Sequence, residues 1–171
     1  MQDIFHEQLV KRDLSGTDKL KRLGLILMVA MVLTASMTFI PFPMLSMFVA
    51  IGFGYLAYIL IGRLKREYEY SYTNGELDID VIYNKSSRKR IFSGQVRDFE
   101  IMAHTEDSSH QNSFSSVNTK MDCSTGILSD RSYTFVANYE SKRVAITIEP
   151  NDEILALLAK ALTRRKFHPK R

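Results

Sequence analysis

The chain has 171 residues, 25% of them charged, with a formal net charge of +4 and one cysteine. A single cysteine excludes an intramolecular disulfide, which fits a reducing compartment. The flanks of an apolar segment and the C-terminal tail account for most of the excess basic residues, so the charge gives no support to nucleic-acid binding.

Residues 1–19 form the first segment, and their pattern favours a short helix lying at the membrane interface. Ile4, Phe5 and Leu9 fall on one stripe of such a helix, with the charged residues mostly elsewhere. The segment ends near Thr17, which can cap the helix that follows. An unstructured polar terminus is the alternative, and the composition does not separate the two.

A forty-residue segment without a charged side chain follows, from Leu23 to Gly62. As a single helix it would be roughly 60 Å long, about twice the hydrocarbon core of a bilayer. Pro41 and Pro43 lie near its middle, where they end one helix and begin another. A buried helical pair in a soluble protein is the alternative, but such helices normally carry charges on an exposed face. We therefore predict a transmembrane hairpin over residues 20–62, with spans Leu20–Ile40 and Phe42–Gly62.

Basic residues flank the hairpin on both sides, whereas the turn between the spans carries no charge. By the positive-inside rule, both termini face the cytoplasm and the turn faces outward. This predicts a multi-pass protein of the cell membrane. The flanking residues are Lys11, Arg12, Lys19, Lys21, Arg22, Arg63, Lys65 and Arg66.

From Glu67 onward the apolar residues alternate with polar ones, which predicts antiparallel strands. Asn74-Gly75 is the strongest hairpin signal in the chain. The segment 104–120 is rich in Ser, Asn, His and Asp and predicts a mobile loop. The seven predicted strands cover residues 68–72, 77–83, 88–93, 96–101, 121–124, 132–137 and 143–149.

An amphipathic helix is predicted after Pro150, with Asn151 as its N-cap. Its apolar face extends from Ile154 to Leu162, and basic residues follow it. We therefore expect one soluble domain over residues 63–166 and a basic tail over residues 167–171.

Several segments carry a resemblance to a known group of proteins. They are Met1–Glu7, Glu67–Tyr70, Thr73–Asp80, Arg88–Arg90 and Val96–Glu100. With these segments the chain resembles bacterial membrane proteins in which a two-helix hairpin leads into a cytoplasmic PH-like domain. The resemblance implies a membrane α-helical hairpin followed by an α+β PH-like domain, a seven-stranded antiparallel split barrel capped by a C-terminal helix. It implies no reaction, and a split barrel with a different closing element is the alternative fold.

A basic cluster is the main candidate binding site. It consists of Lys85, Arg88, Lys89 and Arg90, in the second turn and the third strand. Anionic lipid headgroups attract such residues by about 1 kcal/mol each near a membrane surface. The alternative is a solvated strand that protects the edge of a sheet.

Signals for chemistry are few, and we predict no catalytic residue, cofactor or metal. The sequence has no Gly-rich phosphate loop, nucleophile elbow or CxxC pair. His104, Glu106, Asp107 and His110 could assemble a metal site, but polar loops often contain such residues, and we favour that interpretation. Asp78 and Asp80 share a strand face, where we expect solvated carboxylates rather than an acid/base pair. We expect Cys123 to be an inert core thiol.

Two functional hypotheses follow. The first is a non-catalytic, membrane-anchored interaction module that binds a protein partner or the anionic membrane surface. The second is an oligomeric transporter or pore, or a membrane enzyme that uses the hairpin. The spans lack the ionisable residues that intramembrane chemistry usually needs. The small polar side chains of the spans are Thr34, Ser36, Thr38 and Ser46, and the lack of ionisable groups favours the first hypothesis.

Overall fold

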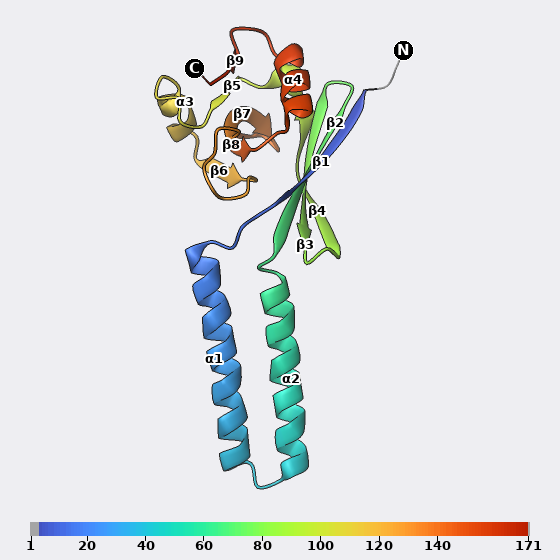
Figure 1. Cartoon of the computed structure of the whole chain (residues 1–171), viewed down its shortest axis with the longest axis vertical. Coiled ribbons are helices and arrows are strands. Elements are labelled where there is room, and N and C mark those ends of the chain that lie inside the picture. The colour runs from blue at the N-terminus through green and yellow to red at the C-terminus, as the bar shows by residue number, and fades with distance from the viewer. Residues whose placement is uncertain (1–3, 171) are drawn as a thin grey trace. The chain divides into compact units, whose positions relative to one another are not determined.

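The computed structural model of the chain describes residues 4–170 and divides it into two compact units (Figure 1). One unit is the helical hairpin, Leu14–Arg66. The other combines the residues up to Asp13 with those from Glu67 onward. The predicted domain over residues 63–166 is therefore corrected: the soluble domain is discontinuous, and the hairpin is inserted into it.

The hairpin consists of helices α1 (Gly16–Phe39) and α2 (Pro43–Gly62), within a few residues of the predicted spans. Ser15 caps α1 by accepting a hydrogen bond from the Thr17 backbone N–H at 3.3 Å. Both helices are long and apolar enough to cross a membrane, and only 6% of the apolar window of each is buried. A helical pair in the core of a soluble protein would be mostly buried, so this exposure favours the membrane interpretation.

The predicted interfacial helix in residues 1–19 is wrong. Residues Phe5–Lys11 form strand β1, which pairs antiparallel with β2 (Arg66–Thr73) and places Val10 opposite Tyr68. The pattern of these residues also has a period of two: the side chains of His6, Gln8 and Val10 are more buried than those between them. A seven-residue helix would have gained only local hydrogen bonds, whereas the strand gains a ladder along β2. Met1, Gln2 and Asp3 of that prediction lie outside the described residues.

The first sheet has the order β1-β2-β3-β4, with β3 at Glu76–Tyr83 and β4 at Ser87–Gln95. The β2–β3 turn is made by Asn74 and Gly75, both with positive φ (49° and 95°), as a type I′ turn requires. The β3–β4 turn likewise has positive φ at Asn84 and Lys85.

The second sheet has the order β6-β8-β7-β5-β9. Its strands are β5 (Ile101–His104), β6 (Thr119–Asp122), β7 (Tyr133–Tyr139), β8 (Lys142–Ile148) and β9 (Phe167–His168). The β6–β8 and β5–β9 pairs are parallel, and the β5–β7 and β7–β8 pairs are antiparallel.

The seven predicted strands all have counterparts, but three details differ. A 3-10 helix, η1 (Val96–Asp98), stands where the fourth strand was predicted to begin. The predicted mobile loop contains a short helix, α3 (Gln111–Ser115), whose Phe114 packs with Val117 against the second sheet. Strand β9 lies within the predicted basic tail. The last residue of that tail, Arg171, is outside the described residues. With β1 and β9 the described residues form two sheets and no closed barrel, so the split-barrel detail is not confirmed.

The core lies between the two sheets and is closed by helix α4 (Asp152–Ala161). Phe92, Phe99 and Phe135 form an aromatic cluster in it, with Phe99 and Phe135 stacked at a centroid distance of 4.2 Å. Ile154 and Leu158 of α4 are fully buried there. Asn151 caps α4, as predicted, by accepting a hydrogen bond from the Ile154 N–H at 2.8 Å.

Tyr70 joins the two sheets through its hydroxyl. The ring is fully buried, the hydroxyl donates to the Cys123 carbonyl at 2.6 Å, and it accepts from the Glu149 N–H at 3.2 Å. Burial raises the pKa of Tyr70 well above its ordinary value, so the hydroxyl stays neutral and can serve both partners.

Replacing Tyr70 by Phe leaves the buried Cys123 carbonyl and Glu149 N–H without this partner. We expect the Tyr70→Phe variant to lose about 1–3 kcal/mol of stability, because unsatisfied buried polar groups retain their desolvation penalty. Chemical denaturation of the purified full chain measures this. The control is Tyr139→Phe, which removes the same oxygen from a partly exposed ring. Equal stability of both variants would contradict the bridging role of Tyr70.

Candidate functional site

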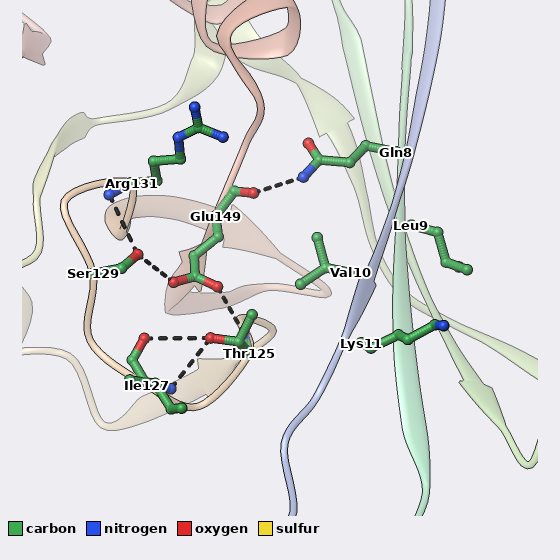
Figure 2. A pocket seen from close by; sticks show the side chains of 9 residues that line it. All are labelled: Gln8, Leu9, Val10, Lys11, Thr125, Ile127, Ser129, Arg131 and Glu149. Atoms are coloured by element: carbon green, nitrogen blue, oxygen red, sulfur yellow. Dashed lines mark hydrogen bonds between the residues drawn. The ribbon is translucent and has the colours of Figure 1, made fainter.

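A groove runs between strand β1 and the segment that follows β6 (Figure 2). Its volume is about 440 Å³. Residues Gln8–Lys11 line one wall, and Glu149 lies toward the end of β8. The opposite wall is the segment 125–131, which contributes Thr125, Ile127, Ser129 and Arg131.

Glu149 is buried in the groove and organises its opposite wall. Its carboxylate accepts hydrogen bonds from the Ser129 hydroxyl at 2.6 Å, the Ser132 hydroxyl at 3.1 Å and the Thr125 N–H at 2.9 Å. Burial by itself raises the pKa of Glu149, but the bonds from Ser129, Thr125 and Ser132 outweigh it, and the pKa is lowered. Because its lone pairs are occupied in this way, Glu149 acts as an anchor of the wall rather than as a free base.

Two polar clamps hold β1 against the second sheet, one toward each end of the groove. Gln8 donates from Nε2 to the Glu149 carbonyl at 2.9 Å and accepts at Oε1 from the Asn151 N–H at 2.6 Å. Arg12 donates to the Asp122 carbonyl at 2.7 Å and pairs with the Asp122 carboxylate at 3.1 Å. Between the clamps the edge of β1 borders the groove.

Strand β1 and the segment opposite it both carry exposed apolar side chains. Outside the hairpin, the exposed large hydrophobic residues among those described are Ile4, Phe5 and Leu9 on β1 or directly before it, and Ile127 and Leu128 on the opposite wall. Leu9 is 49% exposed and Ile127 is 60% exposed. Figure 2 shows that Leu9 and Lys11 point to one side of β1, while Gln8 and Val10 point toward Glu149. The groove therefore has the exposed Ile127 on its rim and a saturated polar floor, whereas the Leu9 side chain lies on the other face of β1.

The predicted basic cluster is largely neutralised by carboxylates of the same sheet. Arg88 pairs with Glu69, and the Arg90 guanidinium contacts Asp80 at 2.6 Å and Asp78 at 3.0 Å. Glu69 and Asp80 are buried, so these two arginines compensate charges that would otherwise be costly.

The two lysines of the cluster differ from its arginines. Lys85 and Lys89 are exposed, and neither has a carboxylate partner in the part of the chain that the structure describes. The cluster thus offers two free positive charges to an anionic surface rather than four.

The prediction of two solvated carboxylates at Asp78 and Asp80 is wrong for Asp80, and Asp78 is paired with Arg90. Asp78 is partly exposed, but Asp80 is 6% exposed and fixed by Arg90. The β-bulge at Ile79 and Asp80 lies at this point of the β3–β4 ladder.

The pKa of Glu69, the ion-pair partner of Arg88, is shifted by burial and by a second carboxyl group. Burial raises the pKa of Glu69, the neighbouring Glu7 on β1 raises it further, and Arg88 opposes both. Glu7 stands opposite Ser71, two residues from Glu69 on β2, so the two carboxylates repel each other when both are charged.

The histidine-rich loop folds around a second pocket of about 650 Å³. His104, Asp107 and His110 line it together with His168 of β9, whose ring stacks on His110 at 4.1 Å. His110 hydrogen-bonds Asp107 at 2.9 Å. Within residues 4–170, no three His, Cys, Asp or Glu side chains are placed to hold a metal ion. His168 was missed because its neighbours in the pocket are distant in sequence.

Cys123 is buried in the core, as predicted. It is 1% exposed, and burial raises its pKa to about 12, so its thiolate is scarce at neutral pH.

Two packed sheets closed by a C-terminal helix define a PH-like domain, here with two candidate membrane spans inserted between its first two strands. The model of one protein family, described as bacterial PH-like domain (DUF6106), matches residues 2–168, and the chain belongs to this family. No curated protein and no solved structure matches the chain.

Replacing Glu149 by Gln tests how the groove is held. The lowered pKa means that Glu149 contributes stability above its ordinary pKa, about 4.5, and that this contribution is lost as the pH falls through the folded value. At neutral pH we expect Glu149→Gln to cost about 1–3 kcal/mol, because three charge-assisted bonds weaken.

The measurement is the denaturation midpoint of the full chain between about pH 7 and pH 3. The difference between wild type and Glu149→Gln should shrink toward the acidic end. Asp152→Asn serves as the control, because Asp152 is exposed and makes one ion pair, to Arg131 at 3.5 Å. A difference that stays constant with pH would show that Glu149 is not charged in the folded state.

Proposed function

We propose that this protein is a membrane-anchored interaction module. The two-span hairpin holds it in the cell membrane, and the PH-like domain binds a partner protein on the cytoplasmic side through the groove beside β1. In this proposal its role is non-catalytic.

One observation carries the proposal: an unpaired strand edge borders an open groove with the exposed Ile127 on its opposite wall. β1 is the first strand of its sheet, so within residues 4–170 one of its edges has no neighbouring strand. Soluble domains usually blunt such edges with charges or cover them, because a free edge is a template for another chain. The other edge strand of this sheet, β4, carries three consecutive basic residues, Arg88-Lys89-Arg90, whereas the exposed residues of β1 alternate between apolar and charged: Phe5, Glu7, Leu9 and Lys11.

The ion pairs of the basic cluster favour a protein as the binding partner rather than the anionic membrane surface. Arg88 and Arg90 are engaged with Glu69, Asp78 and Asp80, which leaves two lysines for headgroups. Two basic residues near a surface supply only about 2 kcal/mol of attraction. The groove offers apolar burial instead, which is the larger source of binding free energy.

The hydrogen bonds made by the hydroxyl groups of the spans support the hypothesis that the hairpin is an anchor rather than a pore. Thr34, Ser36, Thr38 and Ser46 each donate to a backbone carbonyl three or four residues earlier in the same helix. Their donors are therefore already used within each helix.

The topology can be tested at the turn between the spans. We expect a Phe42→Cys variant to react with a membrane-impermeant maleimide in intact cells, because the positive-inside rule places this uncharged turn outside. The native Cys123 gives little background, because it is buried.

A Ser109→Cys variant is the matched control, since Ser109 lies on an exposed loop of the PH-like domain. It should react only after the membrane is permeabilised. Labelling of Ser109→Cys in intact cells, with none at Phe42→Cys, would invert the topology.

The partner-binding role is tested by site-specific photocrosslinking in the native membrane. A photoreactive amino acid at Ile127, on the rim of the groove, should give a discrete adduct with one protein, identified by mass spectrometry. The same amino acid at Lys142, at the exposed β7–β8 turn, should not. Adducts at both positions, or at neither, would contradict a partner site in the groove.

A further inference from the structure

We propose that the partner segment bound at this site is an extended peptide that adds antiparallel to the free edge of β1. Its sequence pattern is acidic–x–apolar–x–basic. This inference rests on the proposed function and specifies how the partner is held.

The backbone of β1 shows which residues face the free edge. The Asn74 N–H donates to the Ile4 carbonyl at 3.1 Å, so the backbone groups of Ile4 point toward β2. In an antiparallel pair this direction alternates along the strand. Residues 6, 8 and 10 therefore also point toward β2, and residues 5, 7, 9 and 11 point away from it.

A second hydrogen bond agrees with this assignment and closes one end of the edge. The Asp13 N–H, two residues beyond Lys11, donates to the Thr125 carbonyl at 2.8 Å. No such bond reaches Glu7, Leu9 or Lys11 from any other backbone group in residues 4–170. The open edge thus presents three residues whose backbone donors and acceptors a single extended segment can pair.

The side chains on the outer face of this edge set the pattern of the partner. Glu7, Leu9 and Lys11 are all exposed and follow one another at a spacing of two. Cross-strand neighbours of opposite charge stabilise a sheet, and like charges destabilise it. An antiparallel segment therefore needs an acidic residue opposite Lys11, an apolar one opposite Leu9 and a basic one opposite Glu7.

The basic residue opposite Glu7 has a further effect. Glu7 and Glu69 repel each other when both are ionised. A positive charge beside Glu7 offsets this repulsion, so that position of the partner contributes more than an isolated surface pair does.

The two intervening side chains of the partner point to the opposite face, where the groove lies. They stand opposite Gln8 and Val10, whose side chains Figure 2 shows on the Glu149 side of β1. The groove has a volume of about 440 Å³, and Val10 and Ile127 line it. We therefore expect medium-sized apolar residues, such as Val, at these two positions.

The test uses the full chain in lipid nanodiscs and two capped, fluorescent peptides. The matched probe is Ser-Glu-Val-Ile-Val-Lys-Ser, which follows the predicted pattern in the antiparallel direction. The swapped probe is Ser-Lys-Val-Ile-Val-Glu-Ser, which has the same composition but matches β1 only in the parallel direction. Fluorescence anisotropy should show tighter binding of the matched probe by at least about threefold, because two charge pairs change sign.

Charge reversal on the protein supplies the decisive control. The double variant Glu7→Lys/Lys11→Glu should bind the swapped probe more tightly than the matched one by a similar factor. Equal affinities of wild type for both probes, or an unchanged preference in the double variant, would overturn the proposal. A preference of wild type for the swapped probe would overturn the antiparallel orientation.

Leu9→Pro tests the backbone pairing itself. Proline removes the N–H of Leu9 on the free edge, a position where an edge strand tolerates it, and leaves the groups that face β2 in place. We expect it to abolish binding of both probes while the chain keeps a cooperative melt. If that variant unfolds, the charge-reversal pair still decides the question.

β1 itself contains the pattern Glu7-x-Leu9-x-Lys11, so a second copy of this chain is the competing occupant. Loading nanodiscs with one or two chains distinguishes the cases. Full binding of the matched probe by single-chain discs supports a separate partner, and loss of the site in two-chain discs would assign the edge to self-association. If the Ile127 adduct forms but the two probes bind equally, the interaction module stands and the strand-addition mode fails.

Discussion

The buried hydroxyl of Tyr70 is the contact on which the arrangement of the PH-like domain depends. It bridges β2 of the first sheet to Cys123 and Glu149, which follow β6 and β8 of the second. An apolar core resists separation of the sheets but does not by itself define how far one slides along the other. A directional bond to two backbone groups defines that register, and the clamps at Gln8 and Arg12 repeat it at the edge. These three contacts hold β1 and β2 against the second sheet. The groove is the space that remains unfilled between the two clamps.

The first sheet shows how buried charge is managed on a face that borders solvent. Glu69 and Asp80 lie under the guanidinium groups of Arg88 and Arg90, so the charges are compensated where dehydration would otherwise be costly. The same pairing explains why a basic cluster identified by sequence spacing does not act as four free charges. Sequence proximity showed that the four residues are adjacent, but the carboxylates that neutralise two of them come from β2 and β3.

Periodicity and turn chemistry were sufficient to predict most of the elements. The forty uncharged residues defined the hairpin, Asn74-Gly75 defined the β2–β3 turn, and Asn151 defined the start of α4. These signals are local, and local physics produces the structure at each of them. β1 was missed because Ile4, Phe5 and Leu9 fit a helical stripe, whereas its partner β2 lies beyond the entire hairpin. Seven residues have little helical preference of their own, so the distant strand determined the outcome.

The candidate site was beyond prediction for the same reason. Gln8, Ile127 and Glu149 come from three parts of the chain and have ordinary residue types. Only one local signal marked any of them: Glu149 ends an apolar strand directly before Pro150, a position where a carboxylate needs a specific partner. Long-range pairing assembles the groove, and a single sequence carries no record of that pairing.

Insertion of the hairpin between β1 and β2 limits what the neighbouring chain can do at this edge. β1 must pass directly into α1 and β2 directly out of α2, with residues 12–15 and 63–65 as the connections. Both connections are short, so neither can fold back over the β1 edge. The two edges of the sheet differ in their charge pattern: β4 carries three consecutive basic residues, whereas β1 has Leu9 between Glu7 and Lys11. A run of like charges discourages pairing with another strand, but alternating opposite charges around an apolar residue can be matched by a complementary one.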